Sequence, residues 1–245
     1  MTWKSHNHRR EFLLCSGAVF AGLAWPALAS ALPAFAVLEE EKGKSETSKE
    51  GEEEISPAED LMREHGVLNR ILLIYDEHIR RLEAKQGFDP AVLARAADIV
   101  KRFVEDYHEK LEENYLFPRF RKAGKLVDLV EVLLMQHQAG RRMTAQIQQL
   151  ASSGTLKGQD KRNMLAGALH AFVRMYRPHE AREDTVLFPA FRSIVSKNEY
   201  DSLGDEFEKK EDELFGNEGF FKVVDQVAEL EKKLGTYDLS QFTPR

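Results

Sequence analysis

The sequence predicts an all-α fold: an antiparallel up-down-up-down four-helix bundle with a C-terminal helical extension. Four long segments between residues 57 and 188 have helix-type patterns, short loops join them, and no strand pattern interrupts them. A hydrophobic fraction of 42% beside 31% charged residues is typical of a globular helical protein. Glycine (15 residues) and proline (8 residues) are scarce, which excludes collagen-like and Gly/Pro-rich low-complexity chains.

The first two helices have clear start signals. Ser56 precedes a proline and is followed three residues later by a glutamate, which predicts a helix over 57–84. Asp89 precedes a second proline, so we expect another helix over 90–117. Pro118 should limit this second helix, because the residue before a proline avoids the α region.

The other two bundle helices are bounded by small residues and prolines. The third is expected over 126–150, ending at the Ser-Ser-Gly sequence of 152–154. The fourth is expected over 160–188, with a kink at Pro178 and an end before Pro189. Together the four helices define a bundle domain of residues 57–195.

The C-terminal residues 196–245 form an extension. Their pattern is helical at 200–214 and 218–234 and extended after that. We expect this extension to pack on the bundle.

The N-terminal residues 1–36 have the features of an export signal. Arg9-Arg10 and the following Phe-Leu resemble a twin-arginine signal, an apolar stretch comes next, and small residues offer a cleavage site after Ala36. Residues 37–56 are a charged, disordered linker by composition. We therefore expect a periplasmic protein. An ordinary secretory signal and an uncleaved membrane anchor are the alternatives.

Charge and cysteine content narrow the function classes. The net charge is −6 and there is no long basic run, so nucleic acid and, once the signal is cleaved, membrane surfaces are not expected partners. The one cysteine, Cys15, lies in the export signal. The mature chain therefore has no disulfide, no thiolate metal site and no cysteine nucleophile.

An internal repeat brings histidines and carboxylates to matching positions. His108 and His179, 71 residues apart, each open the pattern His-Glu-x-x-Glu-acid-x-x-Leu-Phe-Pro-x-Phe. Residues 61–65 match residues 133–137 at an offset of 72, and both stretches end in histidine. The bundle thus reads as two copies of a helical hairpin. The Leu-Phe-Pro segments are interpreted as packing and helix-terminating residues.

This repeat predicts a dinuclear metal site. Residues four apart lie on one helix face, so each second helix of a hairpin presents a histidine and a glutamate inward. The first helices add one imidazole each. The predicted ligands are His65, His108, Glu112, His137, His179 and Glu183. Glu109 and Glu180 are further candidates for terminal ligands.

The donor set favours iron or manganese over zinc, because imidazole and carboxylate without thiolate suit those ions. The unfilled coordination positions can take water, O2, peroxide or NO. The alternative is that the histidines are ordinary core residues. Four of them at matching positions, two with glutamate at i+4, argue against it, because burying such groups is costly unless they are paired or bind metal.

These elements resemble the hemerythrin family in its bacterial HHE cation-binding branch, over residues 57–195. The matching motifs are Glu64-His65, His108-x-x-x-Glu112-Glu113, Leu-Phe-Pro, Gln136-His137 and His179-x-x-x-Glu183. The resemblance implies a four-helix bundle that holds a non-haem centre of two iron ions. It makes the four histidines terminal ligands and Glu112 and Glu183 bridging carboxylates.

The sequence departs from the oxygen-carrying members in one position. They have a second histidine four residues after the one in the third helix, where this chain has Arg141. Arg141 is expected either to leave the centre more open or to pair with Glu109 or Glu180. The family's last carboxylate is an aspartate that corresponds to Asp184, but Glu183 is preferred because it mirrors Glu112.

The function predicted on this basis is cation binding at a di-iron centre that takes O2, NO or peroxide, for sensing, storage or detoxification. The alternatives are a di-iron enzyme that consumes peroxide or NO, and an iron store or carrier without oxygen chemistry. A binding protein is favoured over a dedicated enzyme. No substrate pocket, nucleotide site or Ser/His/Asp arrangement is evident in the sequence.

Overall fold

The computed structural model describes residues 55–152 and 158–244. The predicted export signal and nearly all of the predicted linker therefore lie outside the described residues. Every regular element in the described part is helical. Within it, no helix is both long enough and apolar enough to span a membrane.

The first helix begins and ends as its sequence predicts. Helix α1 spans Pro57–Glu83, and the Ser56 hydroxyl accepts a hydrogen bond from the Glu59 amide at 3.3 Å. Helix α2 (Pro90–Ile99) begins in the same way, with the Asp89 carboxylate accepting from the Ala91 amide at 2.9 Å. These caps satisfy backbone amides that have no partner inside the helix.

The second bundle helix is continuous and longer than predicted. Its successive parts are α2, the π-helical η3 (Val100–His108), α3 (Glu109–Leu111), the π-helical η4 (Glu112–Leu116) and α4 (Phe117–Ala123). The predicted end at Phe117 is wrong. The Phe117 amide bonds to the Glu112 carbonyl five residues back, and this wider turn makes room for the Pro118 ring. Gly124, with φ of 63°, ends the helix instead.

The fourth bundle helix repeats this arrangement. Helix α6 (Gln159–Arg182) contains Pro178 and continues through η5 (Glu183–Leu187) into α7 (Phe188–Phe191). The predicted end at Phe188 is therefore one turn too early, because η5 is again a wide turn placed just before a proline. The third helix, α5, spans Val127–Ser152, close to its predicted range.

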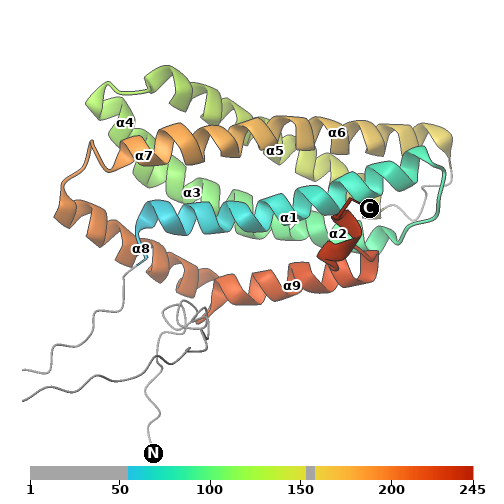
Figure 1. The fold of residues 1–245 in the computed structure, drawn as a ribbon. Coiled ribbons are helices and arrows are strands. Elements are labelled where there is room, and N and C mark those ends of the chain that lie inside the picture. The colour runs from blue at the N-terminus through green and yellow to red at the C-terminus, as the bar shows by residue number, and fades with distance from the viewer. Residues whose placement is uncertain (1–54, 153–157, 245) are drawn as a thin grey trace, which may run out of the picture. The chain divides into compact units, whose positions relative to one another are not determined.

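Helices α8 (Lys197–Phe215) and α9 (Gly219–Leu234) form the two predicted C-terminal helices, and both contact α1 (Figure 1). Phe215 and Phe220 pack against Phe103 of η3, with ring centroids 5.6 and 6.4 Å apart. Residues expected to be extended after α9 include a short 3-10 turn, η6 (Leu239–Phe242), where the Asp238 carboxylate caps the Ser240 amide.

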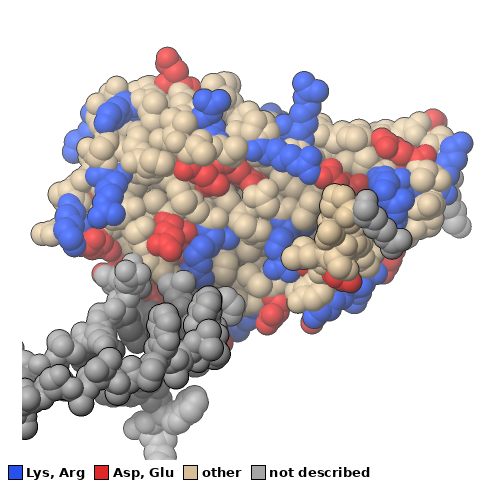
Figure 2. Space-filling view, viewed as in Figure 1, with Lys and Arg blue, Asp and Glu red and all other residues tan. Residues whose placement is uncertain are grey.

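The surface mixes both signs of charge. Figure 2 shows Lys and Arg side chains interspersed with Asp and Glu on the face in view, with no broad area of one sign. The core runs along the bundle axis and is rich in aromatic residues, among them Tyr75, Phe103 and Phe172.

Candidate metal centre

The predicted metal ligands come from all four helices of the bundle and meet in its interior. The histidines are on α1, at the end of η3, on α5 and on α6, and the two glutamates begin η4 and η5. Their exposed fractions are at most 4% for His65, His108, Glu112, His137, His179 and Glu183. A π-helical turn widens the helix where each glutamate projects, a feature that is frequent at functional sites.

The six side chains form two groups of three, which we call the His65/His108 group and the His137/His179 group. In each group one ligand atom from every residue lies within 4.8 Å of the others. Glu112 completes the first group and Glu183 the second. Each group therefore offers two imidazole nitrogens and a carboxylate, a suitable donor set for one metal ion.

Glu112 also reaches the other group. Its Oε2 atom lies 3.8 Å from Nε2 of His108 and 3.3 Å from Nε2 of His137. The two imidazoles belong to different groups. A carboxylate in this position is placed to bridge two metal ions.

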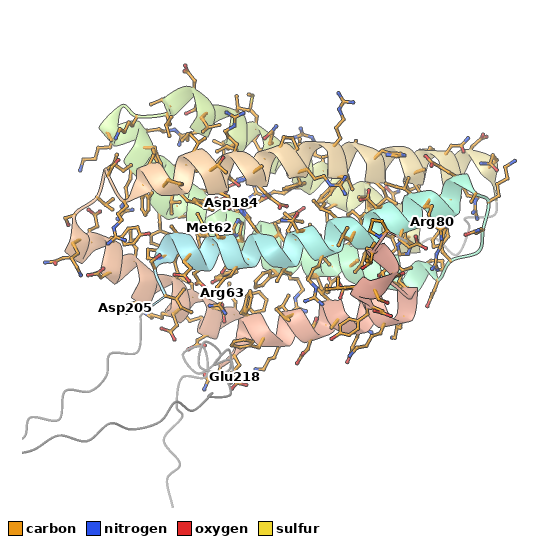
Figure 3. All side chains as sticks on the ribbon, in the orientation of Figure 1. Met62, Arg63, Arg80, Asp184, Asp205 and Glu218 are labelled. Atoms are coloured by element: carbon orange, nitrogen blue, oxygen red, sulfur yellow. The ribbon has the colours of Figure 1, made fainter. Side chains whose placement is uncertain are left out.

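Glu183 occupies the matching position. Its Oε2 atom lies 3.1 Å from Nε2 of His179 and 3.4 Å from Nε2 of His65. Asp184, the alternative carboxylate, lies on the outside, with Oδ1 at 2.7 Å from Nδ1 of His65. Figure 3 shows Asp184 between the fourth bundle helix and α1. The geometry thus places Glu183, and not Asp184, between the imidazoles.

Every histidine of the two groups forms a hydrogen bond through Nδ1, the ring nitrogen that faces away from the centre. A carboxylate or amide oxygen lies at hydrogen-bonding distance from each Nδ1 atom. The pairs are His65 with Asp184 (2.7 Å), His108 with Glu64 (2.7 Å), His137 with Glu113 (3.2 Å) and His179 with Gln136 (2.8 Å). A carboxylate or amide oxygen can only accept, so Nδ1 carries the proton of the neutral imidazole, and the lone pair of Nε2 then faces the centre, as metal-binding histidines require.

The glutamate and histidine atoms that face the centre include several without a hydrogen bond. In the described part of the chain, both carboxylate oxygens of Glu112 and of Glu183 and Nε2 of His137 are buried without a hydrogen bond. An unsatisfied buried polar group costs about 1–3 kcal/mol, and more when it is charged. Histidines that served only to pack the core would have no reason to face unpaired buried carboxylates. A bound cation would instead satisfy all of these inner atoms at once. The residues present therefore fit a metal centre.

Burial and the neighbouring charges set the ionisation of the site. Burial raises the pKa of Glu112 well above its usual value, and the negative charge of Glu183 adds to the effect. Burial also lowers the pKa of His108 to about 3 and that of His137 to about 4, so both imidazoles are neutral near pH 7. Burial would lower the pKa of His65 as well, but Asp184 and Glu183 outweigh it and raise that pKa to about 10.

Comparison with known families agrees with this geometry. Residues 56–191 match the family described as the hemerythrin HHE cation binding domain. The chain belongs to this family. Its hemerythrin HHE domain accordingly contains all six candidate ligands, and the family description supports cation binding by the protein.

Relatives extend the similarity beyond the HHE domain. Uncharacterized proteins of Mycobacterium tuberculosis (strain H37Rv) and Mycobacterium bovis are 46% identical over 236 residues, which cover 96% of this chain and 91% of each relative. No solved structure matches the chain. The similarity therefore includes residues on both sides of the HHE domain.

The two further candidate ligands lie outside the two groups. Glu109 accepts a hydrogen bond from the Tyr176 hydroxyl at 2.8 Å and is paired with Arg141, whose Nη2 is 2.8 Å from its Oε2 atom. Of the alternatives considered for Arg141, the structure has the pairing with Glu109. In the other half of the HHE domain, Glu180 accepts a hydrogen bond from Asn69. Both carboxylates are engaged by neighbouring side chains beside the centre.

The Leu-Phe-Pro segments support the histidines. Phe188 stacks on His65 and Phe117 on His137, with ring centroids 5.4 Å apart in both pairs. The predicted packing role of these segments is confirmed. Their predicted role in ending the helices is wrong, as the helices continue past both prolines.

The outer acceptors are functional residues whose role the sequence reasoning did not assign. Glu64 and Gln136 directly precede histidines of the first and third helices, and Glu113 and Asp184 directly follow the inner glutamates. A signal was present, because each pair occupies equivalent positions of the repeat. Which histidine each acceptor holds could not be read from the sequence, because every one of these contacts joins two different helices.

Proposed function

We propose that this chain is a non-haem di-iron protein that binds O2, NO or peroxide for sensing, storage or detoxification. The observation that carries the proposal is that each of two buried glutamates lies between imidazoles of both histidine groups. Shared carboxylates of this kind suit two adjacent cations. The donor set has no thiolate, which favours iron or manganese over zinc.

The protein contributes geometry and exclusion of water. When bound, two adjacent iron ions would supply redox chemistry and open positions for a small ligand. The four Nδ1 hydrogen bonds keep the imidazoles oriented, and the stacked rings of Phe117 and Phe188 shield two of them. Each ion would be held by two imidazoles and the shared carboxylates of Glu112 and Glu183, and positions not filled by these side chains could take a small ligand.

Metal analysis combined with optical spectra tests this function. The full chain is loaded anaerobically with Fe²⁺, its iron content is measured, and spectra are taken before and after exposure to air. We expect about two irons per chain and new charge-transfer bands, which His65→Ala or Glu112→Ala removes. His170→Ala is the matched control, because His170 is exposed and pairs with Glu83. A chain without stoichiometric metal would overturn the proposal.

Consumption of peroxide is the second candidate, and Tyr176 favours it. The Tyr176 ring lies 5.5 Å from that of His179, and its hydroxyl donates to the buried carboxylate of Glu109. A buried tyrosine beside a redox centre can serve as an electron donor to that centre. A peroxide turnover assay distinguishes the candidates: an enzyme loses turnover in Tyr176→Phe while its iron content stays unchanged, whereas a binding protein shows no turnover. Iron uptake without any response to O2, NO or peroxide would instead indicate a store or carrier.

We further propose that the protein is exported to the periplasm. The support is the sequence of residues 1–36, with Arg9-Arg10 before an apolar stretch and small residues up to Ala36. Cell fractionation with N-terminal sequencing of the mature chain tests this. We expect a periplasmic chain that begins near Val37, and retention in the cytoplasm when Arg9 and Arg10 are both changed to lysine.

A further inference from the structure

The His65/His108 group is backed by two carboxylates. Asp184 accepts from Nδ1 of His65 and Glu64 from Nδ1 of His108, both at 2.7 Å. Among the described residues, no lysine or arginine forms an ion pair with Asp184. Both histidines of this group therefore donate to acidic side chains.

More carboxylates stand behind Glu64. Asp60 and Glu211 are buried, and an oxygen of each lies within 4.8 Å of a Glu64 oxygen. One nearby cation is Arg63. Its Nη1 atom lies 4.0 Å from Oδ1 of Asp60, and its guanidinium carbon lies 4.6 Å from the centre of the Phe220 ring. Three buried carboxylates thus lie close together on the outer side of His108.

The His137/His179 group differs at the equivalent position. Gln136, which corresponds to Glu64 in the repeat, accepts from Nδ1 of His179 at 2.8 Å through a neutral amide oxygen. A neutral acceptor orients an imidazole as well as a carboxylate does. It does not raise the basicity of the imidazole to the same extent.

The other acceptor of this group is neutralised. Glu113 lies 3.2 Å from Nδ1 of His137, a longer contact than the other three. The same carboxylate is paired with Arg141 at 2.7 Å and with Lys110 at 2.5 Å. Arg141 also pairs with Glu109 at 2.8 Å, so two cations face two carboxylates here.

We propose that the two metal positions are inequivalent, and that the position held by His65 and His108 binds a divalent cation more tightly than the position held by His137 and His179. The inference rests on the di-iron function proposed above. Its cause lies in the outer acceptors, since the inner donor sets are the same. Outer partners of this type change metal affinity about 10–100-fold. The His137/His179 position is then the one that loses its ion first to a chelator.

Two half-site variants of the full chain test the proposal with Co²⁺ as the probe. His179→Ala impairs the His137/His179 group, and His108→Ala impairs the His65/His108 group. The affinity for the remaining Co²⁺ is measured by calorimetry, with circular dichroism to verify the helical content. We expect the His179→Ala chain to bind its ion about tenfold or more tightly than the His108→Ala chain. The pair His179→Gln and His108→Gln replaces any variant that loses helix.

Exchanging the outer acceptors separates their effect from that of the histidines. Gln136→Glu in the His108→Ala chain should tighten Co²⁺ binding about tenfold, and Asp184→Asn in the His179→Ala chain should weaken it by a similar factor. Gln138→Glu is the matched control, because it adds the same charge on the exposed face two residues away. It should leave the affinity within about twofold.

Each outcome has a distinct meaning. Equal affinities in the two half-site variants, or equal responses to Gln136→Glu and Gln138→Glu, would overturn the inequivalence. If the unmodified chain still takes up two Co²⁺, the di-metal function survives that result. An unmodified chain that binds fewer than two Co²⁺ would overturn the proposed function, and the inequivalence with it.

Discussion

The Tyr176 hydroxyl on α6 donates a hydrogen bond to Oε1 of Glu109 at 2.8 Å, across the backbone of Gly140. A Cβ atom at position 140 would lie 1.9 Å from that hydroxyl oxygen. Glycine is therefore required here for close approach. The lack of a side chain on α5 allows a tyrosine from one helix to reach a carboxylate on another.

Gly140→Ala should consequently destabilise the protein by about 1–3 kcal/mol, because the tyrosine must shift or the helices must separate. Urea unfolding of the metal-free chain measures this. Gly66→Ala is the control, since Gly66 is exposed on α1 and a Cβ there meets nothing within 4 Å. That change should stabilise the helix by up to about 1 kcal/mol. Equal effects of the two substitutions would contradict the steric argument.

Arg70 joins α1 to α9 through a two-pronged ion pair. Its Nε and Nη2 atoms lie 2.9 and 2.6 Å from the two carboxylate oxygens of Glu231. Arg70→Ala should lower the free energy of unfolding by about 1.5–3 kcal/mol, because Glu231 stays buried without its partner. Arg95→Ala, at an exposed pair 3.9 Å apart, should cost less than about 1 kcal/mol. A similar loss of unfolding free energy in both variants would show that the buried α1–α9 pair contributes no more to stability than an exposed pair.

Acid should weaken the C-terminal end of α1. Hydrogen bonds from Arg80 and Arg81 hold the pKa of Glu77 at about 2, below its ordinary 4.5, despite the opposing effect of partial burial. A carboxyl whose pKa is lowered in the folded state stabilises that state above pH 4.5, and the contribution is lost as the pH falls from 4.5 to about 2. Unfolding at several pH values should therefore show a shallower loss in Glu77→Gln than in the unmodified chain. Glu83→Gln, at an exposed site, should keep the unmodified slope.

Metal removal should expose the cost of the buried carboxylates. Iron at 100 times its dissociation constant should stabilise the chain by about 2.7 kcal/mol for each bound ion, and a chelator should remove this gain. Glu112→Gln should abolish most of the gain but stabilise the metal-free chain by about 1–3 kcal/mol, because one of two adjacent buried carboxyls is gone. Thermal unfolding with and without chelator measures both effects. A metal-free Glu112→Gln chain less stable than the unmodified one would contradict this account of the site.

Local sequence determined the elements of the fold where a short-range interaction decides them. The caps at Ser56 and Asp89 predicted helix starts because each cap bonds to an amide two or three residues away. The i, i+4 spacing of histidine and glutamate predicted a shared helix face, because the helical period places residues four apart on the same side. The continuation of the helices past Pro118 and Pro189 could not be predicted in this way, because the wide turns before these prolines depend on the packing of the whole helix.

Tertiary structure alone decided how the candidate ligands combine. The sequence placed His108 and Glu112 on one face, but the approach of α5 brings His137 to that glutamate and the approach of α1 brings Glu64 to the outer nitrogen of His108. For Glu183 and Asp184 the repeat already favoured Glu183, and the packing of α1 against the fourth bundle helix places its Oε2 atom between His65 and His179. Spacing along a helix determines which side chains share a face, whereas the distance and rotation between helices determine which atoms of those side chains meet.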